Sequence, residues 1–511
     1  MRYLFCLTLF ACINLVAVAQ SYMGFDADNF NGVHGVLSNP ANIADSRLNE
    51  DANILSASGF TANNYYKIDY LDFIFDDEAT DFEDLSTKIG ADNIVNGVLN
   101  ADILGPSVMI TLSEKHAFAL TTRLRSLTNV NNIDGQIINF FQTEDLNDID
   151  FFFAPDVDGS VIFNNWVEYG ASYARVLNTG SKVHFLKAGL SIKLLSGRAF
   201  VQAQADDVLV LYNSDSDTDP LTVFFEGGAS YSFSDNTDLD VNFIPFSDED
   251  DFNGDDTSFV SQTLGVGLDL GIVYEYRPKF RQNVSRDHVQ EQAIDRGVST
   301  YKYKVGFSIL DLGAMKYDNT RLVDSDLNDI NINQLFGEFE SDVKSGLGVS
   351  ETFSEERFVL PTRVRLDVDA KLKDKFYLNM NTNISLVSRN NTNANRFSNT
   401  VMVSPRYESK WLTVFSPISY IQYGGVGWGA GARIGPLFFG SGTIFSNLIQ
   451  KDQRSKSFDL YAGIKIPIFH EKPVVEEEDP TDGYKSNCDG CVKKEKKMKK
   501  VELDGYKGGI K

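Results

Sequence analysis

Beyond its first 19 residues, the sequence lacks any long run of apolar residues. No segment there approaches the ~20 uninterrupted apolar residues that a membrane-spanning helix requires. A helical membrane protein is therefore excluded. Cysteine is also scarce, because only four occur in 511 residues and two of them, Cys6 and Cys12, lie in the N-terminal stretch. The body of the protein must hold its fold without disulfides.

The N-terminal stretch itself is typical of a secretory signal peptide. Arg2 gives a positive start, residues 4–18 are almost wholly apolar, and Ala17-Val18-Ala19 forms a small-x-small cleavage pattern before Gln20. A lipoprotein signal ending at Cys12 is the alternative. It is disfavoured because Phe10 is bulky for that motif and the apolar run continues past Cys12. We expect residues 1–19 to be removed as a signal peptide.

Histidine is rare, and motifs of known catalytic sites are missing. The sequence contains no Gly-x-Ser-x-Gly, no phosphate-binding loop and no His-Glu-x-x-His. A general base must lie within hydrogen-bond reach of its nucleophile, and the histidines fall singly in predicted turns, termini or loops. They are His34, His116, His184, His288 and His470. We therefore expect no enzymatic activity and no cofactor.

Acidic blocks give the chain its net charge of −24, and they lie between the apolar segments rather than within them. Such acidity opposes binding to the polyanionic backbone of nucleic acids, and it is ordinary for solvated loops. Residues 249–254 imitate the first half of a calcium-binding loop. Val260 stands where that loop requires a carboxylate, so we expect no metal site there.

The strongest pattern is the alternation of apolar and polar residues with a period of two, which predicts strands with one apolar face. Most of the runs are roughly 9–13 residues long, as tilted membrane strands require, whereas strands of soluble sandwiches usually have ~5 or 6. They are residues 104–112, 118–124, 167–173, 186–194, 264–276, 301–310, 363–372, 376–386 and 458–469. The sequence therefore predicts an all-β fold, a transmembrane antiparallel β-barrel.

The two faces of these strands predict which residues meet lipid and which face the lumen. We expect Leu190, Leu268 and Leu366 to face lipid, and Ser191, Asp269 and Asp367 to face inward. The predicted lumen-lining residues are Arg363, Arg365, Asp367, Asp369, Lys371, Asp269 and Glu275. Unpaired charges of this kind would be destabilising in a dry core. In a barrel they could line a selective pore or form a salt-bridge network that keeps the lumen shut, and both alternatives stay open.

Aromatic residues at the ends of predicted strands indicate a girdle at the membrane surfaces. The candidates are Trp166, Tyr274, Tyr276, Tyr301, Trp411 and Trp428.

The alternating pattern stops after His470, which predicts a charged periplasmic tail over residues 471–511. This tail is suited to docking a periplasmic or surface protein partner. It contains Cys488 and Cys491, whose spacing fits either a small disulfide or half of a zinc site. The disulfide is favoured, because no second Cys or His pair follows and the periplasm is oxidising.

Several short motifs resemble those of a family of outer-membrane proteins of unknown function from Bacteroidota. They include residues 22–25, 32–35, 38–47, 306–313, 360–363, 406–408 and 429–437. The element Asn39-Pro40-Ala41 is also similar to one in the long-chain fatty acid transporter group and the related type IX secretion barrels. The resemblance implies about 14 strands over residues 53–470, with residues 20–52 as a hatch-like segment in the lumen.

Three functional hypotheses follow for this protein. The first is an outer-membrane barrel, surrounded by outer-membrane lipid, that passively transports a small or hydrophobic solute. The second is a non-conducting barrel that anchors a surface or secretion assembly, which the acidic loops and charged tail favour. The third is a soluble secreted β-sandwich with an adhesion-like function, and a lack of dependence on detergent would identify it.

Overall fold

The computed structural model describes residues 22–75, 85–89, 94–142, 151–177, 183–213, 222–234, 263–278, 297, 299–326, 330–331, 350–450 and 454–471. Several sequence predictions concern residues outside these ranges and remain predictions. They are those for the signal peptide, residues 249–254, His288, Cys488, Cys491 and the rest of the C-terminal tail from residue 472. Among the helices of the described residues, none is both long and apolar enough to cross a membrane.

The chain forms a closed antiparallel β-barrel. Twenty segments share one sheet, and at six places two segments follow one another along the same strand position, which leaves 14 positions. The barrel closes because β1 pairs with the last strand, β22, from Leu48↔Phe469 to Ala62↔Ser457. The fold and the strand number predicted from sequence are confirmed.

The strand positions follow chain order around the barrel. They are β1 (Leu48–Asn63), β4 and β5 (Ile94–Leu104, Ser107–Thr111), β6 (His116–Asp134), β7 (Phe151–Leu177), β8 (His184–Asn213), β9 and β10 (Thr222–Ser234, Leu264–Tyr276), β11 and β12 (Tyr303–Asp326, Ile330–Asn331), β13 and β14 (Ser350–Val359, Arg363–Lys373), β15 (Phe376–Ser385), β16 (Thr400–Glu408), β17 and β18 (Leu412–Phe415, Ile418–Ile421), β19 and β20 (Gly425–Trp428, Ala430–Ile434), β21 (Leu437–Ser441) and β22 (Ser457–Phe469).

Proline accounts for three of the interruptions along these positions. Pro106 separates β4 from β5, Pro361 separates β13 from β14, and Pro417 separates β17 from β18. Proline has no N–H to donate to the ladder, which explains why pairing is interrupted at these positions.

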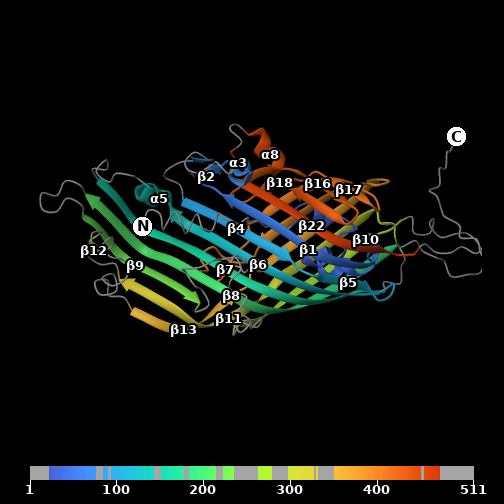
Figure 1. The fold of residues 1–511 in the computed structure, drawn as a ribbon, viewed down its shortest axis with the longest axis horizontal. Coiled ribbons are helices and arrows are strands. Elements are labelled where there is room, and N and C mark those ends of the chain that lie inside the picture. Colours follow the sequence, from blue (N-terminus) through green and yellow to red (C-terminus); the bar gives the residue numbers. More distant parts are fainter. Residues whose placement is uncertain are drawn as a thin grey trace, which may run out of the picture.

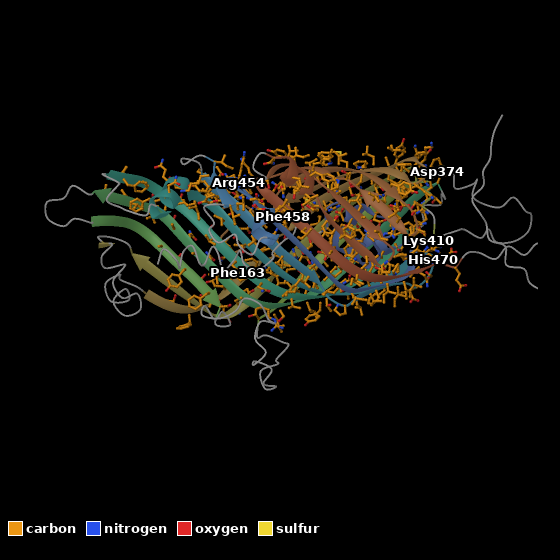
Figure 2. The ribbon with its side chains drawn as sticks, turned by 45° about the horizontal axis from the view of Figure 1, so that its top comes forward. Phe163, Asp374, Lys410, Arg454, Phe458 and His470 are labelled. Atoms are coloured by element: carbon orange, nitrogen blue, oxygen red, sulfur yellow. The ribbon has the colours of Figure 1, made fainter. Side chains whose placement is uncertain are left out.

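Alternation along each strand places apolar side chains outside and polar ones inside. Leu190 and Leu366 are 38% and 43% exposed, whereas Ser191 and Asp269 are 1% and 2% exposed. Leu268 and Asp367 are half-buried. Figure 2 shows the resulting outer surface, on which carbon atoms dominate around the strands. This exterior suits hydrocarbon, and the barrel fold satisfies the backbone internally as a bilayer requires.

The two ends of the barrel differ. At one end, which we call the hatch end, β1 begins and β22 ends, and the connections 112–115, 374–375, 409–411 and 435–436 are short turns. Asp374, Lys410 and His470 lie together there in Figure 2. The connection between β10 and β11 at this end, residues 277–302, is longer than these turns. At the opposite loop end, connections such as 135–150, 332–349 and 386–399 are longer.

Several strands extend far toward the loop end. β7 has 27 residues and β8 has 30, whereas a tilted strand crosses a bilayer with about 9–11. In Figure 1 these strands, with β9 and β13, continue well past the short strands β16–β18. The remaining elements lie outside the ladder. They are the helices α3 (Tyr70–Phe75), α5 (Gly135–Gln142) and α8 (Ile444–Ile449), and the hairpin of β2 (Tyr66–Ile68) and β3 (Ser86–Lys88).

Two of the six predicted girdle residues face inward, so the prediction was wrong for them. Trp166 is fully buried against Phe200 and Tyr317 in an interior apolar cluster. It lies on the same strand face as Glu168, because the two are two residues apart. Tyr301 precedes β11 and turns inward, where its hydroxyl donates to Asp369 Oδ2 at 2.5 Å. Trp411 and Trp428 are exposed on the outside.

Candidate functional site

The interior of the hatch end is filled by residues 22–47, which we call the hatch. Short turns build it: η1 (Phe25–Ala27), η2 (Gly32–His34), α2 (Gly35–Ser38) and η3 (Pro40–Ile43). Gly24 and Gly32 have φ of 83° and 62°, a backbone conformation that glycine adopts without strain. The first barrel strand begins at Leu48, five residues before the boundary expected from sequence.

Asn39, Pro40 and Ala41 seat the hatch on the wall formed by β8, β10 and β11. The side chain of Asn39 caps η3 by accepting from Ala41 N at 2.9 Å, and its Nδ2 donates to the carbonyls of Ile272 and Phe307 at 3.1 and 3.2 Å. Pro40 occupies the first position of η3, where its missing N–H costs nothing.

Glycines in the wall permit this close approach. A Cβ on Gly271 would lie 2.0 Å from Asn39 Oδ1, and one on Gly189 would lie 2.4 Å from Ala41 N. The two glycines are paired across β8 and β10. They form a flat seat that no residue with a side chain could provide.

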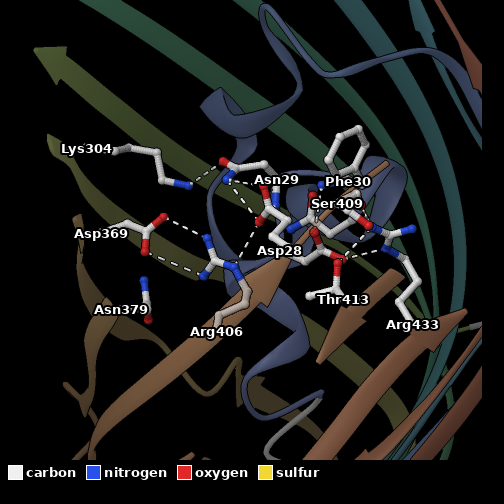
Figure 3. Close-up of polar contacts among 12 residues, drawn as sticks. Asp28, Asn29, Phe30, Lys304, Asp369, Asn379, Arg406, Ser409, Thr413 and Arg433 are labelled. Atoms are coloured by element: carbon white, nitrogen blue, oxygen red, sulfur yellow. Dashed lines mark hydrogen bonds and ion pairs between the residues drawn. The ribbon is translucent and has the colours of Figure 1, made fainter. Parts of the chain in front are cut away.

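Buried ion pairs hold the hatch to three other parts of the wall. Asp26 pairs with Arg365 of β14. Asp28 Oδ2 accepts from Arg433 Nε of β20 at 2.6 Å, as Figure 3 shows. Asp45 pairs with Arg277 at 2.6 Å.

Lysines and an amide add bonds to the hatch backbone and side chains. Lys465 Nζ donates to Phe30 O at 2.6 Å, and Lys187 Nζ donates to Ala44 O at 3.1 Å. Asn29 Nδ2 donates to Glu408 Oε1 at 2.9 Å. Together with the ion pairs, these contacts satisfy many of the hatch polar groups that burial in a lumen would otherwise leave unpaired.

Apolar contacts complete the seat. Phe25 stacks on Phe438 with ring centroids 4.1 Å apart, and Tyr22 packs edge-on against Tyr461 at 5.8 Å. His34 lies among these rings and its Nε2 lies 3.0 Å from Ser56 Oγ. Burial, with the positive charge of Lys465, holds the pKa of His34 well below its usual range. The imidazole is therefore neutral.

The charged row predicted on β14 faces the interior, where its members contact different partners. Arg365 reaches the hatch, Asp369 accepts from Arg406 at 2.9 Å, and Lys371 Nζ donates to Ser299 O at 2.9 Å. Asp367 accepts from Asn379 Nδ2 at 3.1 Å. Arg363 lies 3.9 Å from Asp311. This arrangement corresponds to the paired network rather than to an open charged pore.

The two predicted residues of β10 are also paired. Asp269 lies 2.9 Å from Lys193 Nζ, and Glu275 lies 2.6 Å from Lys187 Nζ. Glu275 also pairs with Arg277, so the pair extends to Asp45 of the hatch.

A central ion cluster lies between the hatch and the loop end, and only two of its members, Asp269 and Arg363, were predicted from sequence. Its four cations and four carboxylates are Arg123, Arg125, Lys193 and Arg363 with Asp102, Glu168, Asp269 and Asp311. Asp311 accepts from Arg125 Nη1 at 2.8 Å and from Lys193 Nζ at 2.7 Å. Alternation would place Asp311 with Phe307 and Ile309 on the lipid face. A bulge opposite Asp269, with a φ of 59° at Asp311, turns it inward.

The connection between β15 and β16, residues 386–399, also folds into the lumen, and no sequence pattern predicted this. Asn395 is fully buried, and its Nδ2 donates to Leu127 O and Ile162 O at 3.3 and 3.1 Å. The ring of Phe397 lies beneath two guanidinium groups, 5.3 Å from that of Arg125 and 4.2 Å from that of Arg363. We call residues 386–399 the inward loop.

Two small cavities border the hatch. One of about 30 Å³ is lined by hatch residues including Asp26 and Ser38 and by Arg363, Arg365 and Thr400 of the wall. The other, of about 10 Å³, lies beside Asn39 and Lys304. Since one water needs ~10–15 Å³ of such volume, these cavities accommodate a few waters and no larger solute. Among the described residues, no group of three His, Cys, Asp or Glu side chains could hold a metal ion.

Comparison with known proteins gives a family and a set of distant folds. A model of the family described as "Family of unknown function (DUF5723)" matches residues 40–442. No curated protein matches the chain by sequence.

Three solved structures are similar in outline. The toluene transporter TodX of P. putida is 10% identical over 86% of this chain and 95% of its own, with a TM-score of 0.40. A FadL homologue of Pseudomonas aeruginosa is 13% identical over 85% and 93%, at 0.38. The toluene transporter TbuX of Ralstonia pickettii is 10% identical over 86% and 95%, at 0.37. Likeness of this degree does not extend to function.

Proposed function

We propose that this chain, which belongs to the family of unknown function DUF5723, passively transports a small or hydrophobic solute across an outer membrane, with its hatch as the movable gate. The observation that carries this proposal is the seat of the hatch. Residues 22–47 continue into the wall at β1, and their other polar contacts with it are ion pairs and hydrogen bonds in which at least one partner is a side chain.

The energetics of the seat support a gate. A buried ion pair contributes little net stability, because desolvation offsets its Coulombic attraction. The three hatch pairs Asp26–Arg365, Asp28–Arg433 and Asp45–Arg277 would regain hydration when the hatch leaves. Replacing these ion pairs by contacts with water therefore costs less free energy than exposing an apolar plug of equal size to water.

The shape of the barrel supports an orientation. Outer-membrane barrels have short periplasmic turns and longer extracellular loops, which supports an orientation with the hatch end toward the periplasm and the loop end outside. The proposed partners follow from this orientation: lipid around the strands, and a periplasmic or surface protein at the tail.

A second candidate function is a barrel that anchors an assembly and conducts nothing. The central ion cluster favours it, because four cations and four carboxylates neutralise one another across the lumen. The apolar packing of Phe25 and Tyr22 also favours a permanent plug.

Deletion of residues 22–46 separates the two functions. This deletion keeps Leu48 and therefore the whole of β1. We expect a folded barrel, judged by heat-modifiable gel mobility, with raised conductance in planar bilayers. A second variant should also replace residues 387–398 by a short Gly-Ser turn, since the inward loop lies in the same lumen. Baseline conductance in both folded variants would make anchoring the better explanation.

A further inference from the structure

The inward loop concentrates positive charge in an otherwise acidic protein. Residues 386–399 contain Arg389 and Arg396 and no Asp or Glu, although the whole chain has a net charge of −24. The neighbouring segment 418–424, which comprises β18 and the turn that leads to β19, also lacks acidic residues. An anion that enters from the loop end would therefore meet a local cationic region.

Among the residues that the structure describes, Arg396 is buried without a counterion. It is 5% exposed, and its Nη2 donates to the neutral amide of Gln422 at 3.3 Å. Its Nε and Nη1 have no hydrogen-bond partner among the described residues. Other buried arginines of the interior contrast with it, because Arg125, Arg406 and Arg433 reach carboxylates at 2.7, 2.9 and 2.6 Å.

A third unused donor adjoins this guanidinium. Tyr423 follows Gln422, and its hydroxyl is buried with no partner among the residues that the structure describes. Its backbone has a φ of 72°, which is strained for a residue other than glycine. The guanidinium of Arg389 lies 5.4 Å from the Tyr423 ring. Two cations and a phenol thus gather at one place.

The loop backbone is fixed so that Arg396 keeps this position. Arg396 N donates to Asn129 Oδ1 at 2.8 Å, and Asn129 Nδ2 donates back to Arg396 O at 3.0 Å. Burial lowers the pKa of Arg396, which reflects the same uncompensated charge. An anion bound at Nε and Nη1 would remove the desolvation penalty of that charge.

We propose that Arg396, with Tyr423, binds the oxyanion group of a small solute, a carboxylate or a phosphate, at the loop end of the lumen. The proposal rests on the transport function, since it names the class of solute that would be carried. The planar edge of a guanidinium donates two parallel hydrogen bonds to such a group, and the Tyr423 hydroxyl donates a third. Arg389, which is exposed, would attract the anion before it enters.

Binding is tested with the full-length protein in detergent. Inorganic phosphate and acetate are titrated against sodium chloride at equal ionic strength, and binding is followed by melting temperature and by equilibrium dialysis of labelled phosphate. We expect the melting temperature to rise with the oxyanions. In R396Q we expect affinity to fall at least tenfold, while Y423F causes a smaller loss. The matched control is R357Q, which removes the same charge from an exposed position of β13 and should bind as wild type.

The stability of R396Q without oxyanion separates a binding role from a structural one. Removal of an uncompensated buried charge should leave the melting temperature unchanged or raised. A lower melting temperature in R396Q, with oxyanion effects equal to wild type, would overturn the proposal. The proposal would also be overturned if chloride raised the melting temperature of the wild type as much as the oxyanions do, and if R396Q showed the same rise. These results are independent of the conductance of the hatch deletion, so a barrel that binds oxyanions and does not conduct would refute transport alone.

Discussion

At the scale of single residues, the seat of Asn39 depends on missing side chains in the wall. Gly271→Ala would place a methyl group 2.0 Å from Asn39 Oδ1. We expect this overpacking to weaken hatch docking by on the order of 1–3 kcal/mol, without any change on the lipid face. A cysteine at Ala27, which is 2% exposed, should then react roughly tenfold faster or more with a maleimide, in a background without Cys488 and Cys491.

Gly97→Ala is the matched control for this substitution. Gly97 lies in β4, where the nearest atom to an added Cβ is 3.6 Å away, so the intrinsic cost of Gly to Ala in a strand is the same and the clash is absent. Equal labelling rates in Gly271→Ala and Gly97→Ala would mean that the hatch does not depend on the glycine seat.

Trp166 and Asp311 show which inward-facing residues the alternating pattern can predict and which it cannot. The inward position of Trp166 could have been predicted, because it shares its face with Glu168 and Gly170 in the same alternation. Asp311 could not, since the bulge that reverses its side arises from pairing with Asp269 on another strand. The position of the inward loop could not be predicted from the sequence either. Asn395 is held by backbone carbonyls of β6 and β7, which carry no sequence signature.

At the scale of elements, β14 has one face toward lipid and one toward the lumen. Leu366→Arg would place a charge on the outer face near the middle of β14 (Arg363–Lys373). At the bilayer midplane such a substitution costs about 2–4 kcal/mol, and near the surface ~0–1. We therefore expect a larger loss of unfolding free energy for Leu366→Arg than for the control Leu372→Arg, measured by denaturant titration in lipid vesicles. Equal losses would show that position 366 is not at membrane depth.

The hatch as an element was partly predictable. Pro40 and the lack of alternation exclude a strand before Leu48, and the resemblance of the Asn39-Pro40-Ala41 element implied a lumen segment. Of the predicted lumen-lining row from Arg363 to Lys371, Arg365 is the member that forms an ion pair with the hatch among the described residues. Arg433 of β20 and Arg277, which follows the end of β10, supply the others. Such pairs depend on closure of the barrel, which brings distant strands to one lumen.

The Asp28–Arg433 pair gives a prediction for the hatch. Asp28→Asn or Arg433→Gln should each reduce the unfolding free energy by about 3–5 kcal/mol, because each leaves a buried charge without its partner. The double variant should lose less than the sum of the two, by ~0.5–3 kcal/mol. A double-mutant cycle in lipid vesicles measures this coupling. Strict additivity would mean that the 2.6 Å contact contributes no interaction energy.

At the scale of the whole molecule, the unequal strand lengths and unequal loops support the proposed orientation of the two ends. The 30 residues of β8 span about 100 Å at ~3.3 Å per residue, far more than a bilayer, so the loop end must project into water. Short turns are typical of the periplasmic side, and the hatch end has them at 374–375, 409–411 and 435–436.

Cysteines at the two ends test this orientation in cells. Asp374 lies in the β14–β15 turn at the hatch end, and Asn390 is exposed in the inward loop at the opposite end. With Cys488 and Cys491 replaced by serine, a membrane-impermeant maleimide should label Asn390→Cys in intact cells and Asp374→Cys only after the outer membrane is opened. The reverse result would place the hatch at the cell surface. The oxyanion site at Arg396 would then face the periplasm, and transport through this barrel would run outward from the site rather than toward the hatch.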